Sequence, residues 1–425
     1  MSAGREVFAN LVKLLGGKAA AGLISLVYIA IVTRALGPQG FGLLVTVNAW
    51  AITVGGVIAF SGWHGIVRYG AQARAAGDVL RLLRLTRFMT LVELALGLLA
   101  IATAALLAPV VAPRFGWPPE LVPLTQLYAL AIVANLLTTP HGLLQLADRF
   151  DLLALHPVIS PLVRLAGTLW VWLNGGGLHD YLIVWLVSAM SEGVVKWLLA
   201  IPALRVLRQR QPLVGSTKGT IGENAGLVRF LAVTNVDLTL RDLAPKAVPL
   251  IVGWALGPAA AGLYSVAQRA AVIVQQPAIQ LSQASFPTIA EAFARADRSS
   301  GLRLAWRTAL WALAIACVVV TVLALFAPLV VTFLAGRQFV AAAGVFVLLA
   351  FGRAALLGAV PLSSALLAEG RTTASVAINV GANLLTLPLL AWALPAFGLA
   401  AAGWYGLLTG LLTLAALALA VQRPR

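Results

Sequence analysis

Long apolar stretches separated by short polar turns repeat along the whole of this 425-residue chain. Each stretch is close to the roughly 20 residues that an α-helix needs to cross the hydrocarbon core of a bilayer. The stretches do not alternate apolar and polar residues, so helices are favoured over the strands of a barrel. The pattern predicts twelve spanning helices with centres near Leu23, Ile52, Ala100, Ile132, Leu169, Val187, Pro245, Ile273, Cys317, Leu349, Leu385 and Leu411.

The composition supports a membrane as the solvent for this chain. Hydrophobic residues make up 61% of the sequence and charged residues only 10%, whereas soluble domains are nearer one half and one quarter. The N-terminal "MSAGREVFANLVKLLGGK" is too charged for a signal peptide, so we expect a cytoplasmic start that leads into the first span. Cys317 is alone and the four histidines are far apart in the sequence, so neither a disulfide framework nor a metal site is expected.

Basic residues divide unevenly between the two sides of the predicted helices. With the N-terminus inside, the inner segments receive 20 of the 30 basic residues, and the outer turns receive Arg34, Arg114 and Arg337. This asymmetry follows the positive-inside rule and predicts that both termini are cytoplasmic. The net charge of +16 is then mainly an orientation signal, and nucleic-acid binding is disfavoured. The basic stretch from Arg74 to Arg87 either adds to that signal or lies on the anionic inner leaflet.

Three short motifs occur twice in the same order. "ALGPQGFGLL" is echoed by "ALGPAAAGLY", "LLAPVV" by "LFAPLVV", and "LAD" by "LAE", with offsets of 220, 219 and 221 residues. These echoes predict two copies of a six-helix unit, and because six is even the copies are parallel repeats. We expect an N-terminal lobe over residues 1–204, a cytoplasmic linker over 205–227 and a C-terminal lobe over 228–425. Two lobes that rock about a central site make a transporter; a pore or scaffold is the weaker alternative.

The stretch "TRALGPQGFGLLVTVNAW" from Thr33 resembles the start of bacterial polysaccharide or O-antigen flippases (Wzx-like proteins) of the multidrug/oligosaccharidyl-lipid/polysaccharide exporter superfamily. The resemblance implies an all-α protein of the bacterial inner membrane with the V-shaped fold of the multidrug and toxin extruders (MATE transporters). It also implies translocation of undecaprenyl-diphosphate-linked oligosaccharide from the inner to the outer leaflet. Its expected partners are that substrate, membrane lipid and other polysaccharide-assembly membrane proteins.

Seven basic residues fall inside the predicted spans: Lys18, Arg164, Lys196, Arg241, Lys246, Arg269 and Arg353. A charge at the bilayer centre costs about 2.5–3.5 kcal/mol or more, so such side chains normally face the bundle interior or water. Three acids lie four residues before a base, in the pairs Glu192–Lys196, Asp237–Arg241 and Asp242–Lys246. On a helix this spacing favours ion pairs, and neutralisation is the favoured role of Glu192 with Lys196. Four net positive charges remain in the spans by this count.

The resembled flippases line their cavity with the first two helices of each lobe, and in this chain those helices hold Lys18, Arg241, Lys246 and Arg269. The resemblance therefore implies that these four residues bind the diphosphate headgroup. Their chemistry is suitable, because arginine offers a planar fork to phosphate oxygens and lysine a compact charge. We expect Arg164 and Arg353 to make structural hydrogen bonds within a lobe instead.

No loop has the G-x-x-x-x-G-K-[ST] spacing of an ATP site, so no cofactor is expected. The membrane potential, or coupling to H⁺ or Na⁺, is expected to drive transport. Asp237 and Asp242 are the candidates for ion coupling, and ion pairing alone is the open alternative. A MATE-type multidrug or cation antiporter, an uncoupled scramblase and an anion channel remain as other functions. A membrane glycosyltransferase or polymerase is disfavoured, because no paired carboxylates or Ser-His-Asp set appears; we expect no enzyme activity.

Overall fold

The computed structural model of the protein describes residues 3–58, 60–136, 138–212, 214–294 and 298–423; the side chains of Lys18 and Arg241 lie outside what it describes. Within these ranges the chain forms helices and turns and no strand. The predicted all-α class is therefore confirmed. In the same ranges, nine helical segments are long and apolar enough to cross a membrane, so the chain is a multi-pass membrane protein.

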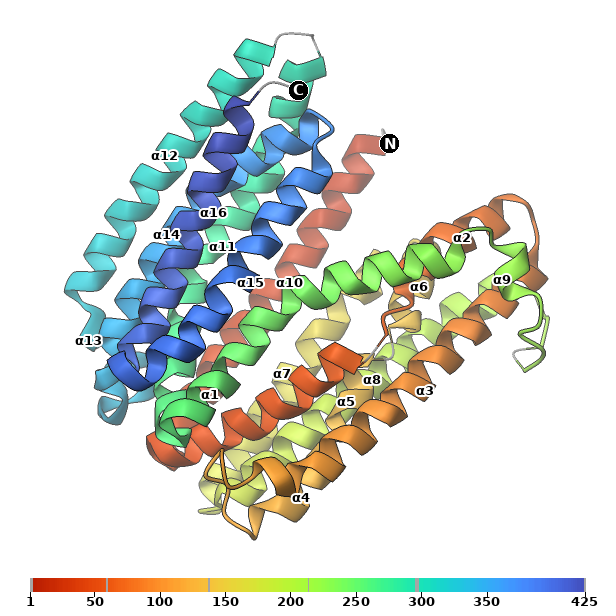
Figure 1. The fold of residues 1–425 in the computed structure, drawn as a ribbon. Helices are drawn as coiled ribbons and strands as arrows, with labels where there is room; N and C mark the ends of the chain where they lie inside the picture. The colour runs from red at the N-terminus through yellow and green to blue at the C-terminus, as the bar shows by residue number, and fades with distance from the viewer. Residues whose placement is uncertain (1–2, 59, 137, 213, 295–297, 424–425) are drawn as a thin grey trace. The chain divides into compact units, whose positions relative to one another are not determined.

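Contacts divide the chain into two compact units. Unit 1 comprises Met1–Leu36 and Val47–Lys246, and unit 2 comprises Gly37–Thr46 and Ala247–Arg425. The helices in which unit 1 predominates are α1 (Ala3–Ile58), α2 (Trp63–Ala75), α3 (Val79–Val111), α4 (Leu121–Tyr128), α5 (Ala131–Leu136), α6 (Thr139–Leu146), α7 (Phe150–Leu173), α8 (Leu178–Leu207), α9 (Thr220–Glu223) and α10 (Leu227–Leu256). Unit 2 contains α11 (Pro258–Ala294), α12 (Arg298–Leu325), α13 (Ala327–Ala335), a 3₁₀ turn η1 (Arg337–Ala342), α14 (Ala343–Ala368), α15 (Thr372–Phe397) and α16 (Ala400–Gln422) (Figure 1).

Two helices of unit 1 are interrupted, and the interruptions position the polar residues described below. One runs from the end of α1 at Ile58 to the start of α2 at Trp63, and the other from the end of α5 at Leu136 to the start of α6 at Thr139. Both α2 and α6 pack against one another and against α3. Irregular backbone at membrane depth must find its hydrogen bonds inside the protein, because lipid supplies none.

Helix α14 is the central helix of unit 2 and packs against α11, α12 and α16. Glycines allow the closest of these approaches: a β-carbon on Gly352 would overlap the carbonyl of Gly406, and one on Gly410 would overlap the carbonyl of Gly352. Small residues at helix contacts bring backbones together and increase van der Waals packing, which drives helix association in lipid.

Every one of the twelve predicted span centres lies in a helix. Leu23 and Ile52 share α1, where Gly37 adopts φ 63° and Pro38 follows it. The nine apolar segments found in the described ranges count α1 once and do not include α10 or α11. The exact number of twelve spans, and with it the predicted lobe boundaries at residues 204 and 228, stays a prediction.

The repeated motifs have matching backbone roles. Gly37 and Gly257 both adopt positive φ, 63° and 84°, directly before a proline that starts the next helical stretch. After α6, Asp148 has a φ of 56°, and after α14, Gly370 has a φ of 77°. In the first copy the left-handed residue is Asp148 itself, whereas in the second copy it is Gly370, which follows Glu369. The two left-handed residues are therefore 222 residues apart, one more than the 221 residues that separate Asp148 from Glu369 in the sequence echo.

Candidate functional site

Lys246 and Asp242 form an ion pair on α10 in unit 1. The Nζ atom of Lys246 lies 3.0 Å from Oδ2 of Asp242, and the two side chains are 36% and 63% exposed. Pairing cancels the net charge of the two groups, while their exposure leaves each able to meet water or a ligand. The backbone carbonyl of Lys246 also accepts a hydrogen bond of 3.2 Å from the hydroxyl of Thr53 in α1. The pair is thus held at a fixed place beside α1.

The other predicted headgroup residues are placed along their helices. Lys18 lies in α1 and Arg241 in α10, and their side chains fall outside the described residues. Arg269 lies in α11 of unit 2 and is half-buried. Asp237, on α10, is half-buried and lies close enough to His64 in α2 for its charge to act on that ring. The assignment of these residues to a headgroup or coupling site stays a prediction.

Glu192 and Lys196 are joined on α8 at 3.0 Å, and the side chains are 25% and 14% exposed. The predicted ion pair is therefore present. The imidazole of His156 on α7 lies close enough to this ion pair to interact electrostatically with both residues. The Nδ1 atom of His156 lies 2.9 Å from the carbonyl of Leu153.

Three of the four histidines lie near one another, which their separation in the sequence had not indicated. The rings of His141 and His156 have centroids 6.0 Å apart. The ring centroid of Trp63 lies 5.2 Å from that of His141 and 3.5 Å from that of His64. Within the described residues no group of three or more His, Cys, Asp or Glu side chains has the arrangement of a metal site. The three histidines are half-buried in unit 1 and contact one another or Trp63 through their rings.

Arg164 on α7 makes neutral contacts. Its Nε donates to Ser188 at 3.0 Å and its Nη1 to the hydroxyl of Tyr28 at 3.2 Å. The guanidinium also lies 4.5 Å from the ring centroid of Trp185. Within the described part of the chain, no ion pair neutralises Arg164. Hydroxyls and aromatic faces therefore hold the half-buried guanidinium, and these structural contacts are those expected from the sequence.

Arg353, in unit 2, also lies near tyrosines. It lies on α14, and its electrostatic neighbours are Tyr264 of α11 and Tyr405 of α16. Both tyrosines are buried. Arg164 and Arg353, both within predicted spans, therefore each lie close to at least one tyrosine.

Glu93 on α3 is fully buried and joins the two interrupted helices of unit 1. Its Oε1 accepts hydrogen bonds from the backbone N–H of Gly62 at 2.8 Å and from the hydroxyl of Thr138 at 2.5 Å. Its Oε2 accepts from the backbone N–H groups of Thr138 and Thr139, each at 3.1 Å. The starts of α2 and α6 therefore both present N–H groups to one carboxylate, which is the favourable arrangement for a negative charge at a helix N-terminus.

Asn235 of α10 extends this group of contacts. Its Oδ1 accepts from the backbone N–H of Ser61 at 2.6 Å, and its Nδ2 donates to the carbonyl of Ser61 at 3.2 Å. The hydroxyls of Ser61 and Thr138 lie 3.2 Å apart. We call Ser61, Gly62, Glu93, Thr138, Thr139 and Asn235 the Glu93 junction. It supplies hydrogen-bond partners to the backbone N–H groups of Ser61, Gly62, Thr138 and Thr139 and to the carbonyl of Ser61, at the places where the helices are interrupted.

The sequence reasoning missed Glu93. The residue stands in the apolar stretch "LVELALGLL" of a predicted span, so the count of four net positive charges in the spans is too high by one. The signal was available, because a lone acid in a spanning helix is costly and is usually functional. Its partners were not available from the sequence, since Gly62, Thr138 and Asn235 are far from it along the chain.

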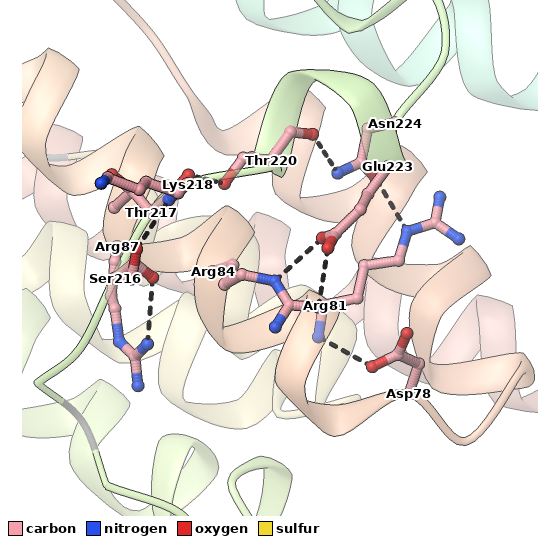
Figure 2. Close-up of polar contacts among 10 residues, drawn as sticks. All are labelled: Asp78, Arg81, Arg84, Arg87, Ser216, Thr217, Lys218, Thr220, Glu223 and Asn224. Carbon is pink, nitrogen blue, oxygen red and sulfur yellow. Dashed lines mark hydrogen bonds and ion pairs between the residues drawn. The ribbon is translucent and has the colours of Figure 1, made fainter.

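The linker between the repeats is bound to the basic start of α3 (Figure 2). Arg84 pairs with Glu223 at 2.9 Å, and Arg81 donates from Nε to the buried amide oxygen of Asn224 at 3.0 Å. Arg87 donates to the carbonyl of Pro212 at 2.5 Å. Three arginines of the stretch Arg74 to Arg87 thus contact the linker. Whether the stretch also lies on the inner leaflet stays a prediction.

The helical fold defines the class of the protein. One similar structure is an inward-facing MATE multidrug-resistance transporter of the multidrug/oligosaccharidyl-lipid/polysaccharide exporter (MOP) superfamily. Its TM-score is 0.70 and its sequence identity 15%, and the match covers 94% of this chain and 92% of that one. The lipid II flippase MurJ in an inward closed conformation is similar with a TM-score of 0.70 and 13% identity, covering 96% and 87%. The chain therefore has the fold of MOP-superfamily transporters.

Sequence comparison then gives the family. The model of a family described as "Polysaccharide biosynthesis protein" matches residues 31–344, so the chain belongs to that family. The inner membrane protein YghQ of Escherichia coli (strain K12) is 26% identical over 289 residues, which are 67% of this chain and 80% of that protein. The family expected from the motif at Thr33 is thereby confirmed, and the expected transporter fold is present.

Proposed function

We propose that the protein is a flippase that moves undecaprenyl-diphosphate-linked oligosaccharide, a polysaccharide or O-antigen precursor, from the inner to the outer leaflet of the bacterial inner membrane. The observation that carries this proposal is membership of a polysaccharide biosynthesis family in a chain with a transporter fold. The similar fold of a lipid II flippase supports a lipid-linked substrate. The proposal assigns no catalytic step to the chain and places both termini in the cytoplasm.

Lys18, Arg241, Lys246 and Arg269 are the proposed contacts of the diphosphate. Each offers donors suited to phosphate oxygens. The pairing of Lys246 with Asp242 reduces its net contribution, so the proposal gives Arg241 and Arg269 the larger part. In this scheme the polyprenyl tail stays in lipid while the charged head crosses through the protein by alternating access.

The membrane potential favours export of an anionic head. One charge that crosses 100 mV gains about 2.3 kcal/mol, so two phosphate charges gain about twice that amount. Coupling to H⁺ or Na⁺ would add to this gain, and Asp237 and Asp242 remain proposed coupling residues.

Reconstitution tests the proposal. The purified protein in liposomes receives a fluorescent polyprenyl-diphosphate sugar, and the fraction that reaches the opposite leaflet is measured by quenching from outside. Arg241→Ala and Arg269→Ala should each lower the rate at least about tenfold, the loss expected from one charge-assisted contact of about 1.5–3 kcal/mol. Arg303→Ala is the matched control, because Arg303 is exposed and donates to Ser300 at the start of its own helix. Unchanged flipping in both test variants would remove the headgroup site.

A MATE-type multidrug antiporter is the second candidate, supported by the 0.70 TM-score to such a transporter. Its distinguishing observation would be extrusion of cationic dyes from cells that express the chain. The surplus of arginine within the predicted spans argues against it, since a positive interior repels cations. Dye efflux above the background of an empty vector, with no flipping of the lipid-linked sugar, would decide for the antiporter.

A further inference from the structure

The strongest unassigned feature of unit 1 is the carboxylate of Glu93. It is fully buried in a membrane-spanning segment, and it accepts hydrogen bonds from three backbone N–H groups and one hydroxyl. Because N–H and O–H hydrogens surround the two oxygens, the arrangement repels a metal cation and accommodates only a proton as an added positive charge. The carboxylate of Glu93 is therefore not suited to bind a sodium ion.

The hydrogen bonds and the burial of Glu93 act in opposite directions on its charge. Burial disfavours the ionised carboxylate, and hydrogen bonds from two helix starts favour it. If the starts of α2 and α6 moved away from α3, the carboxylate would be left buried without its donors. A buried, unpaired charge is costly, so that rearranged state requires a proton on Glu93.

The titratable and charged groups on the surrounding elements do not supply a counter-charge. Helix α2 carries His64, Arg68 and Arg74, α6 carries His141, and α10 carries Arg229, Asp237, Arg241, Asp242 and Lys246. Arg74 pairs with Asp148 at 3.5 Å, and Lys246 pairs with Asp242 at 3.0 Å. Burial lowers the pKa of His64 from its usual value, and the negative charge of Asp237 opposes that effect. Arg68 is exposed and lies over the ring of Phe230 at 4.5 Å. Within the described residues no ion pair includes Glu93.

We propose that Glu93 is a proton-binding site that fastens the starts of α2 and α6 to α3 when ionised and releases them when protonated. Proton uptake and opening of the Glu93 junction are then linked, and each must bias the other by the same factor. Asn235 extends the effect to α10, because it holds Ser61 at the same junction. The inference rests on the proposed function only in naming the proton as the coupling ion for transport.

Amide hydrogen exchange on the full-length protein in phosphatidylethanolamine/phosphatidylglycerol nanodiscs tests the site without any substrate. The amides of Gly62, Thr138 and Thr139 donate directly to Glu93 and so report on the junction. After correction for intrinsic exchange, their opening in the wild type should increase up to about tenfold per unit decrease in pH, as linkage to one proton requires. In Glu93→Gln, exchange at pH 8 should already equal the wild-type level at pH 5 and should not vary with pH.

Two controls and one further variant keep the test sharp. Glu120→Gln removes an exposed carboxyl that caps nothing at the start of α4 and should leave the wild-type profile. The double change His64→Gln with His141→Gln should retain the pH slope, which excludes the nearby imidazoles as its source. Thr138→Ala keeps the carboxyl but removes one donor. Its curve of amide exchange against pH should therefore move to higher pH by about 1 unit and meet the wild-type curve at low pH.

Flat exchange in the wild type, or wild-type pH dependence in Glu93→Gln, would overturn the proposal. If Glu93→Gln does not fold, Thr138→Ala decides, because a merely structural role for the junction would raise exchange by one factor at every pH. Failure of this experiment leaves the flipping assay unaffected. Equally, a failure to flip the sugar leaves the proton site standing.

Discussion

The carbonyl oxygen of Pro258 occupies the place that a β-carbon on Gly42 would take. The relationship is reciprocal, since a β-carbon on Gly262 would lie 2.5 Å from the carbonyl oxygen of Pro38. Gly42 and Gly262 are equivalent residues of the repeated motif, as are Pro38 and Pro258, and all four belong to unit 2. The two copies of the motif therefore cross through their glycines, which explains why each copy ends its short gap with Gly-Leu.

We expect Gly42→Ala to destabilise unit 2, because the added methyl group overlaps a backbone carbonyl that has no rotamer to change. Overpacking of this kind costs about 1–3 kcal/mol. Cys317, the single cysteine, lies on α12 in the same unit and is half-buried, so a thiol-reactive dye reports thermal unfolding there. The control is Gly381→Ala on α15, where a β-carbon would meet nothing within 4 Å. A melting temperature for Gly42→Ala equal to that of Gly381→Ala would contradict the crossing.

The contact between the linker and α3 predicts a charge-reversal result. Arg84→Glu removes the ion pair with Glu223 and places two acids together, so the linker should open more often. The pair is partly buried, with side chains 25% and 33% exposed, so we expect its loss to make linker opening about 1 kcal/mol more favourable. This change corresponds to about fivefold faster cleavage by a lysine-specific protease at the exposed Lys218. The double change Arg84→Glu with Glu223→Arg should restore the slow rate. Arg149→Glu, which breaks only the exposed local pair with Asp151, should not alter cleavage.

Arg164 should not be replaceable by lysine. Lysine cannot stack its charge on Trp185 while it donates to both Ser188 and Tyr28. We expect Arg164→Lys to lower the free energy of unfolding by about 2 kcal/mol, the size of a desolvated cation–π contact with one hydrogen bond. Thermal unfolding in detergent, followed by tryptophan fluorescence, measures the effect, and Arg205→Lys at the exposed end of α8 is the control. Equal stability of the two variants would show that the aromatic contact of Arg164 contributes nothing.

Asp242→Asn separates the two open roles of Asp242. If the residue only pairs with Lys246, the change frees a lysine and should lower the lipid-sugar concentration for half-maximal flipping by up to about fivefold. The opposite result, flipping that loses its response to a proton or sodium gradient, would establish Asp242 as a coupling residue. The liposome assay measures both, and Asp180→Asn at the start of α8 serves as the control, because an asparagine there can still accept the hydrogen bond from the N–H of Gly177.

Local pattern determined much of the architecture in advance. The apolar stretches predicted the helices because the length and composition of a span are properties of consecutive residues. The repeated Gly-Pro motif has the same backbone form at Gly37 and at Gly257, because glycine tolerates positive φ and proline cannot continue a preceding helix. The i,i+4 spacing predicted the pairs Glu192–Lys196 and Asp242–Lys246, since the geometry of one helix is sufficient to bring them together.

Only the tertiary structure decided how unit 1 uses its isolated polar residues. Glu93 receives its hydrogen bonds from helix starts 31, 45 and 46 residues away along the chain, and no period or spacing encodes those distances. The same holds for the grouping of His64, His141 and His156 and for the linker on α3. By itself the sequence determined that the chain forms apolar helices, repeats and belongs in a membrane. Folding determined which buried charge meets which donor, because that choice depends on packing between helices distant in sequence.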